Sequence, residues 1–252
     1  MIIRKSAQEL EKMRRAGRIV AGTIDAVLAH VRPGKTTEDL DRVAVAYIAE
    51  QGATPSFLGY RGFTKTICAS INDEIVHGIP SSHRVLAEGD LVSLDFGAIW
   101  EGFHADSAVT VFAGGQAPDA DAERLVLATE RALTEAIEQI RPGGRLSDIG
   151  HAIERVALAE GLGIVREYGG HGIGRAMHED PFISNFGPPG RGPGLHPGLV
   201  IAVEPMLNLG RGETRTLADG WTVVTDDGSR SAHFEHTIAV TDQGHEVLTA
   251  RD

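Results

Sequence analysis

The sequence predicts an α/β fold of the α+β kind, in which helices and short strands form two similar halves of one domain. Amphipathic helical patterns alternate with short, apolar, β-prone runs along the 252 residues. A group of motifs also recurs at one constant offset of 109 residues. A long β-hairpin that carries one aspartate on each strand closes the first half.

Two helices are expected at the start of the chain. Ser6 and Glu9 form a capping box for a helix that extends towards residue 30 and ends at an Arg-Pro-Gly turn. Thr36 or Thr37 caps a second helix, which stops at Gly52.

The same pattern returns in the second part of the chain. Arg141-Pro142-Gly143 repeats Arg32-Pro33-Gly34, and the same offset carries Asp95 onto Glu204. Because one offset holds at both ends of a long unit, we predict a single domain of two repeated halves, roughly 1–112 and 113–252.

The hairpin Leu91–Phe112 consists of two apolar runs separated by Trp100-Glu101-Gly102. A turn centred between the first two of these residues would place Asp95 directly opposite Asp106, with Cβ atoms about 5 Å apart. Two facing carboxylates in a half-buried sheet repel each other and lose hydration. The hairpin contains no Lys or Arg to neutralise them, so the pattern indicates a bound cation.

Four later segments complete the prediction. The glycine density of Tyr168–His178 argues against a helix and for backbone close to a ligand. Phe186–Gly198 is expected to be a loop and Thr222–Thr225 a short strand. Ala232–Val240 is expected to be the last strand, interrupted by Glu235.

Composition excludes several classes of protein. A net charge of -11 without a basic tract argues against nucleic-acid binding. The single cysteine, Cys68, excludes an internal disulfide and suits a reducing compartment. The N-terminal stretch has no apolar core of a secretory signal, and no apolar run is long enough to span a bilayer. We therefore expect a soluble cytoplasmic protein.

Four carboxylates and one imidazole are the candidate metal ligands. Taken singly, a strand carboxylate is more often an edge or turn residue, and a histidine such as His171 is as often structural as functional. Together they are too acidic to cluster without two divalent cations, and oxygen-rich ligation favours Mn, Fe(II) or Co. The ligand candidates are Asp95, Asp106, His171, Glu204 and Glu235. The histidines expected to be structural or at the surface are His30, His83, His104, His151, His196, His233, His236 and His245.

The motifs GHGIGRAMH, DFGAIWEGFHAD, VEP and HFEHT resemble those of the methionine aminopeptidases, in their type I bacterial form. The resemblance covers nearly the whole chain. It implies the pita-bread fold, in which two pseudo-symmetric halves share a central antiparallel sheet flanked by helices and enclose two metal ions. It also implies that the five candidates are the ligands, with Asp106 and Glu235 bridging the ions.

The resemblance further assigns residues to the substrate. His77 and His178 would contact the substrate around the scissile bond, and Glu204 would also transfer a proton. The methionine side chain would be held by Tyr60, Phe63, Cys68, Met177 and Trp221. Departures from the family pattern lie here: Phe63 and Met177 replace common aromatic residues, and Phe57 stands where a cysteine is frequent.

The implied activity is removal of the N-terminal methionine from peptides and newly made proteins when the second residue is small, by a water held between the two ions. The substrate is the partner expected, with the ribosome as a candidate and no nucleic acid or membrane; a monomer is expected. One alternative is a proline-specific aminopeptidase or prolidase of the same fold, although such enzymes carry an extra N-terminal domain. The other is a non-catalytic binding module, which the five filled ligand positions disfavour.

Overall fold

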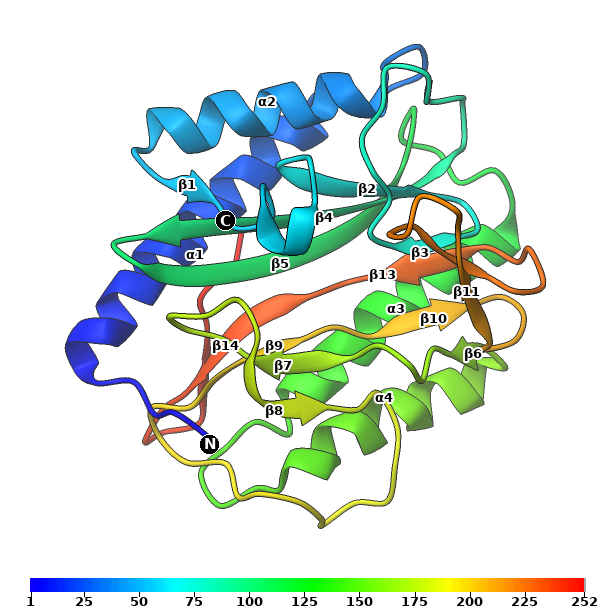
Figure 1. The fold of residues 1–252 in the computed structure, drawn as a ribbon. Helices are drawn as coiled ribbons and strands as arrows, with labels where there is room; N and C mark the ends of the chain where they lie inside the picture. Colours follow the sequence, from blue (N-terminus) through cyan, green and yellow to red (C-terminus); the bar gives the residue numbers. More distant parts are fainter. Residues whose placement is uncertain (252) are drawn as a thin grey trace.

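A computed structural model describes residues 1–251. Strands occupy the middle of the molecule, α1 passes behind β4 and β5, and α3 lies behind β10 and β13 (Figure 1). The helices are α1 (Ala7–Leu28), α2 (Thr37–Glu50), α3 (Ala120–Ile137) and α4 (Leu146–Glu160), with a short 3-10 helix η1 (Tyr60–Gly62).

All strand pairs are antiparallel. The strands of the first half are β1 (Thr54–Pro55), β2 (Ile67–Ile71), β3 (Glu74–Val76), β4 (Leu91–Trp100) and β5 (Phe103–Phe112). Those of the second half are β6 (Gly163–Ile164), β7 (Gly170–Gly172), β8 (Glu179–Ile183), β9 (Val200–Val203), β10 (Met206–Asn208), β11 (Thr214–Thr216), β12 (Val223–Thr225), β13 (Ser231–His233), β14 (His236–Val240) and β15 (His245–Val247). The predicted mixture of helices and antiparallel strands is confirmed.

The helix starts follow from their caps. Ser6 accepts from the backbone N–H of Glu9, and the Glu9 side chain accepts from the backbone N–H of Ser6, which completes the predicted capping box of α1. Thr36 rather than Thr37 caps α2, through the same arrangement with Asp39. Each box satisfies two N–H groups that the first helical turn leaves without partners.

The predicted hairpin forms, but its predicted register is wrong. Trp100 pairs with Phe103, so Asp95 faces Ala108 and Asp106 faces Gly97. The reason is the turn: Glu101 (φ 47°) and Gly102 (φ 80°) both occupy the left-handed region and form the two-residue loop by themselves. The two aspartates are therefore diagonal neighbours on one face of the hairpin rather than a directly opposed pair.

The end of the chain also differs from its prediction. Ala232–Val240 is two strands, β13 and β14, because the backbone leaves the ladder at Phe234 and Glu235. β14 is not the last strand, since β15 follows and pairs with it.

The two parts of the chain make the same local backbone contacts. Gly34 N–H donates to Leu86 O at 2.9 Å, and 109 residues later Gly143 N–H donates to Leu195 O at 3.0 Å. Both glycines have φ of 83°. The start of β4 at Leu91 likewise corresponds to the start of β9.

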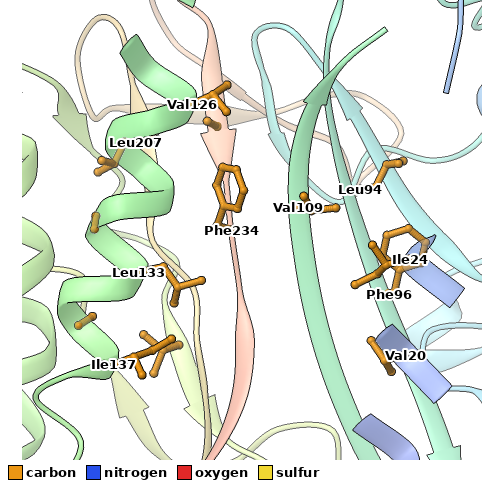
Figure 2. Packing of buried hydrophobic residues seen from close by; sticks show 14 of the residues in the cluster. Val20, Ile24, Leu94, Phe96, Val109, Val126, Leu133, Ile137, Leu207 and Phe234 are labelled. Carbon is orange, nitrogen blue, oxygen red and sulfur yellow. The ribbon is translucent and has the colours of Figure 1, made fainter. Parts of the chain in front are cut away.

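One buried apolar cluster runs through both parts of the chain. It joins Ile24 of α1 and Phe96 of β4 to Leu133 of α3 and to Phe234, which lies between α3 and β5 in the segment before β14 (Figure 2). Each such side chain contributes about 1.5–3 kcal/mol on burial. This core fixes the position of β5 against the strands of the second half, where the candidate ligands lie.

Across residues 1–251, no helix is both long enough and apolar enough to cross a membrane.

Candidate metal centre

The structure brings the five candidate ligands to one place from separate segments of the chain. Asp95 lies on β4, Asp106 on β5 and His171 on β7, while Glu204 follows β9 and Glu235 separates β13 from β14. His171 Nε2 lies 3.8 Å from Asp106 Oδ2 and 3.7 Å from Glu204 Oε1. One ligand atom each from Asp106, His171 and Glu235 lies within 4.8 Å of the other two. Such separations are too long for hydrogen bonds and suit ligand atoms that surround a shared ion.

The seam between β5 and the segment around β14 sets Asp106 beside Glu235. Glu235 N–H donates to Ala108 O at 3.0 Å. Thr237 Oγ1 accepts from Asp106 N–H at 2.9 Å and donates to Asp106 O at 2.7 Å. The backbone at both residues is thus held by bonds that leave their carboxylates free.

Three carboxylate oxygens in this cluster are buried without a hydrogen-bond partner: Asp95 Oδ1, Asp106 Oδ1 and Glu235 Oε1. A cavity adjoins this cluster. Among the residues that the structure describes, Arg61 is the one Lys or Arg whose side chain lines it. Buried acceptors without donors cost free energy unless a cation or a proton satisfies them. The residues present therefore fit divalent metal ions.

The raised pKa values of these carboxyl groups also fit a site for divalent metal ions. Burial raises the pKa of Asp95 to about 7 and, together with the charge of Asp95, that of Glu204 to about 8. Burial and neighbouring carboxylates raise the pKa of Asp106 and Glu235 well above the usual range. Without a cation the group would hold protons; a bound cation favours the ionised form.

His171 is oriented for ligation by its own backbone neighbour. Its Nδ1 lies 2.9 Å from Gly172 O, so Nδ1 carries the proton and donates it to that carbonyl. The lone pair of Nε2 is then available towards the carboxylates. Burial lowers the pKa of His171 to about 3, which keeps the ring neutral. A hydrogen bond of this kind to the second ring nitrogen is usual for histidines that bind metals.

His77 and His178 lie beside this cluster, in the cavity that it lines. The ring centroids of His178 and His171 are 4.2 Å apart. His77 has φ of 61°, an uncommon conformation for a residue with a Cβ, and its ring contacts Trp221 edge-on. Burial lowers the pKa of His77 to about 4 and also lowers that of His178. Both rings are neutral at pH 7.

A cavity of about 250 Å³ extends from the cluster between apolar side chains. Phe63 packs edge-on against Trp221 at 5.1 Å between ring centroids. Cys68 is buried opposite Asp95 on the neighbouring strand, and burial raises the pKa of its thiol. The structure brings together all the residues expected around a methionine side chain: Tyr60, Phe63, Cys68, Met177 and Trp221, with Phe57 beside them.

A wider opening of about 550 Å³ adjoins this cavity and shares five lining residues with it: His77, Tyr168, His171, His178 and Glu204. Its lining includes Phe182, whose side chain is exposed at the surface. A larger groove of about 690 Å³ between α1 and α3 includes none of the five candidate ligands.

Sequence reasoning missed His233, which was expected to be structural or at the surface. It is 2 % exposed, and its Nε2 lies 3.7 Å from Glu204 Oε2 with no hydrogen-bond partner. The available signal was the two-residue spacing of His233 and Glu235, which places alternate strand residues on one face. Arg61 and Tyr168 also line the cavity without having been anticipated.

Comparison with known proteins identifies the family. The profile of metallopeptidase family M24 matches residues 11–242. The chain belongs to this family. It is 51% identical to methionine aminopeptidase 1 of Bacillus subtilis, over 99% of each chain, and 52% identical to methionine aminopeptidase 1 of Mycobacterium tuberculosis, over 99% of this chain and 95% of that one. The crystal structure of methionine aminopeptidase from Thermotoga maritima superposes with a TM-score of 0.97 at 42% identity, over 100% of both chains.

The resemblance drawn from the motifs and the expected pita-bread fold are therefore confirmed, as is the expectation of a metal-dependent aminopeptidase. Prolidase from Pyrococcus furiosus superposes with a TM-score of 0.81 at 22% identity, and this M24 chain covers 66% of it. That likeness extends to the fold alone.

Proposed function

We propose that this M24 metallopeptidase removes the N-terminal methionine from peptides and newly made proteins whose second residue is small. One observation carries the proposal: a single cavity joins the acidic ligand cluster to an apolar lining. An unbranched thioether suits such a lining. The names of the relatives support the same activity.

Asp95, Asp106, His171, Glu204 and Glu235 would hold two divalent ions, with Asp106 and Glu235 shared between them. Their oxygen-rich set with one imidazole favours Mn, Fe(II) or Co over metals that prefer thiolates. When bound, the ions supply Lewis-acid polarisation of the scissile carbonyl and a water of lowered pKa.

The remaining chemistry belongs to side chains of the protein. His178 donates a hydrogen bond to the carbonyl oxygen as negative charge develops on it. His77 contacts the peptide near the scissile nitrogen. Glu204 would pass the proton released by the attacking water to the leaving amine.

A panel of tripeptides varied at positions one and two tests this function. We expect Met-Ala-Ser to be cleaved and peptides with a bulky second residue, such as Met-Leu-Ser, to be resistant. The matched control is Leu-Ala-Ser, which tests the first position alone. Preferential cleavage of Ala-Pro peptides would overturn the proposal in favour of a prolidase.

The chain is proposed to work as a cytoplasmic monomer that meets its substrates as they leave the ribosome. We also infer that residues 1–112 and 113–252 are repeated halves of one domain. The recurrence of the Gly34 and Gly143 contacts supports this division.

A further inference from the structure

Tyr60 makes a direct contact with His178 that goes beyond lining a pocket. Its hydroxyl oxygen lies 2.9 Å from His178 Nδ1. The two rings are stacked, with centroids 5.4 Å apart and an interplanar angle of 22°. The phenol therefore restrains both the position and the tilt of the imidazole.

The direction of this hydrogen bond decides which ring nitrogen carries the proton. Among residues 1–251, the hydroxyl of Tyr60 has His178 as its one hydrogen-bond partner. A phenol that donates to Nδ1 uses its proton within the protein, whereas one that accepted from Nδ1–H would have to give its own proton to solvent. A neutral ring with an acceptor at Nδ1 carries its single proton on Nε2.

The segment that holds Tyr60 is a tightly closed loop. Gly59 N–H donates to Phe63 O at 2.8 Å, and Tyr60 N–H donates to Phe57 O at 2.9 Å. Arg61 is held at φ 48°, in the left-handed region, and its guanidinium lies 5.4 Å from the Tyr60 ring centroid. A conformation of this kind costs free energy and persists where the surroundings impose it, which is common at functional sites.

We propose that Tyr60 is a positioning residue whose hydroxyl donates to His178 Nδ1 and so presents Nε2–H to the substrate's carbonyl oxygen. The inference rests on the proposed function of His178 and adds to it the group that selects the tautomer. The competing view is that Tyr60 acts only as apolar lining of the methionine pocket, in which case its hydroxyl is dispensable.

The tautomer is measured first, in protein freed of metal, by ¹⁵N NMR of histidine side chains in wild type and Tyr60→Phe. Phenylalanine keeps the ring stack and removes only the hydroxyl. We expect His178 to be the Nε2–H form in wild type and a mixture of tautomers in Tyr60→Phe. Tyr47→Phe, a hydroxyl deletion between α1 and α2, is the control and should leave the His178 signals unchanged. An Nδ1–H form in wild type, or identical signals in Tyr60→Phe, overturns the proposal.

Kinetics on Met-Ala-Ser then test whether the hydroxyl acts through His178. Tyr60→Phe should lower kcat roughly 2- to 12-fold, the rate equivalent of one neutral hydrogen bond, with KM nearly unchanged. In a His178→Ala background the same change should have no further effect on kcat. Equal effects in both backgrounds, or a change confined to KM, would show that Tyr60 is only pocket lining.

The proposed function and the proposed role of Tyr60 can be disproved separately. If wild type does not cleave Met-Ala-Ser, the proposed function fails, and the NMR result still decides the hydrogen bond. If wild type cleaves it and the double-variant cycle is additive, the role of Tyr60 alone fails.

Discussion

On the proposed function, the residues of the cavity divide into those that would hold metal and those that would meet substrate. His171 and His178 show the division most clearly, because their rings are 4.2 Å apart and yet have different neighbours. His171 Nε2 faces Asp106 and Glu204, whereas His178 Nδ1 is bonded to Tyr60. Proximity in sequence and in space therefore does not imply one shared role.

His171→Ala and His178→Ala are expected to fail differently. Loss of a ligand should lower metal occupancy together with activity. Loss of an oxyanion donor should leave the metal in place and lower kcat by about 10²–10³, with a much smaller change in KM. Elemental analysis beside steady-state kinetics separates the two. Metal lost from His178→Ala but kept by His171→Ala would reverse the assignments.

His233 is expected to control the orientation of Glu204. A closing movement of roughly 0.8 Å would bring its unpaired Nε2 into hydrogen-bond range of Glu204 Oε2. Removing such a partner typically weakens metal binding about 10- to 100-fold. Titration of metal-free protein with Co²⁺, followed by visible absorption, should show this weakening in His233→Leu and near-normal affinity in His233→Gln, which keeps an N–H donor. Equal Co²⁺ affinities of wild type and His233→Leu would show that His233 has no role in metal binding.

The sequence pointed to the candidate ligands because carboxylates are unusual inside β-prone runs, and Asp95, Asp106 and Glu235 each interrupt one. His233 has only the weaker signal of its two-residue spacing from Glu235, because a histidine fits a strand equally well as a buried ligand partner or as a surface residue. Pocket residues such as Phe63 and Met177 are ordinary core residues by composition. Only the family resemblance pointed to them.

At the scale of elements, the hairpin β4–β5 shows what pattern alone leaves open. The two runs and their approximate turn were evident, but the turn residues Glu101 and Gly102 decide the register. The correction moves every cross-strand partner by two positions. Because side chains alternate with a period of two, Asp95 and Asp106 remain on the same face. The prediction that Asp95 and Asp106 lie at one site therefore still holds, although the predicted register was wrong.

The turns before α2 and α4 offer a test of equivalence between the halves. Gly34 and Gly143 both have φ of 83°, and a Cβ at either position would meet no atom within 4 Å. Replacement by alanine therefore costs only the strain of a residue with a Cβ in the left-handed region. Gly34→Ala and Gly143→Ala should each lower the free energy of unfolding by about 1–2 kcal/mol. Chemical denaturation measures both, with Gly34→Asn and Gly143→Asn as controls that should cost less. A loss at one turn and none at the other would argue against equivalence.

For the whole molecule, the decisive feature is where the halves meet. β5 and the segment around β14 bond along the seam at Ala108 and Glu235, and two members of the acidic cluster, Asp106 and Glu235, belong to this seam. The offset motifs indicated two halves, and the sequence placed Asp95 and Glu204 at matching positions. How the halves dock could not be read from the sequence, because it depends on long-range bonds such as that between Asp106 and Thr237.

The buried cluster should make stability depend on pH. Unfolded carboxyls lose their protons near pH 4, whereas in the metal-free native state Asp95 and Glu204 keep theirs up to about pH 7 and 8. The native state then binds more protons, so stability falls as pH rises from about 6.5 to 8. Below about pH 6.5 the buried histidines, including His171 with its pKa near 3, oppose this trend, because only their unfolded forms take up protons.

Thermal unfolding of chelator-treated protein at several pH values measures how stability changes with pH. Saturating Mn²⁺ should raise the unfolding midpoint more at pH 8 than at pH 6.5, because a bound cation favours the ionised carboxylates. A metal-free midpoint that rises steadily from pH 6.5 to 8 would be incompatible with raised carboxyl pKa values.

The central claim is that this acidic cluster binds the metal on which methionine removal depends. The most direct test is release of free methionine from Met-Ala-Ser by protein stripped of metal, before and after addition of Mn²⁺, Fe²⁺ or Co²⁺. We predict no turnover after chelation, recovery with at least one of these ions, and two ions bound per chain at full activity. Full turnover by protein in which elemental analysis finds no metal would contradict the account.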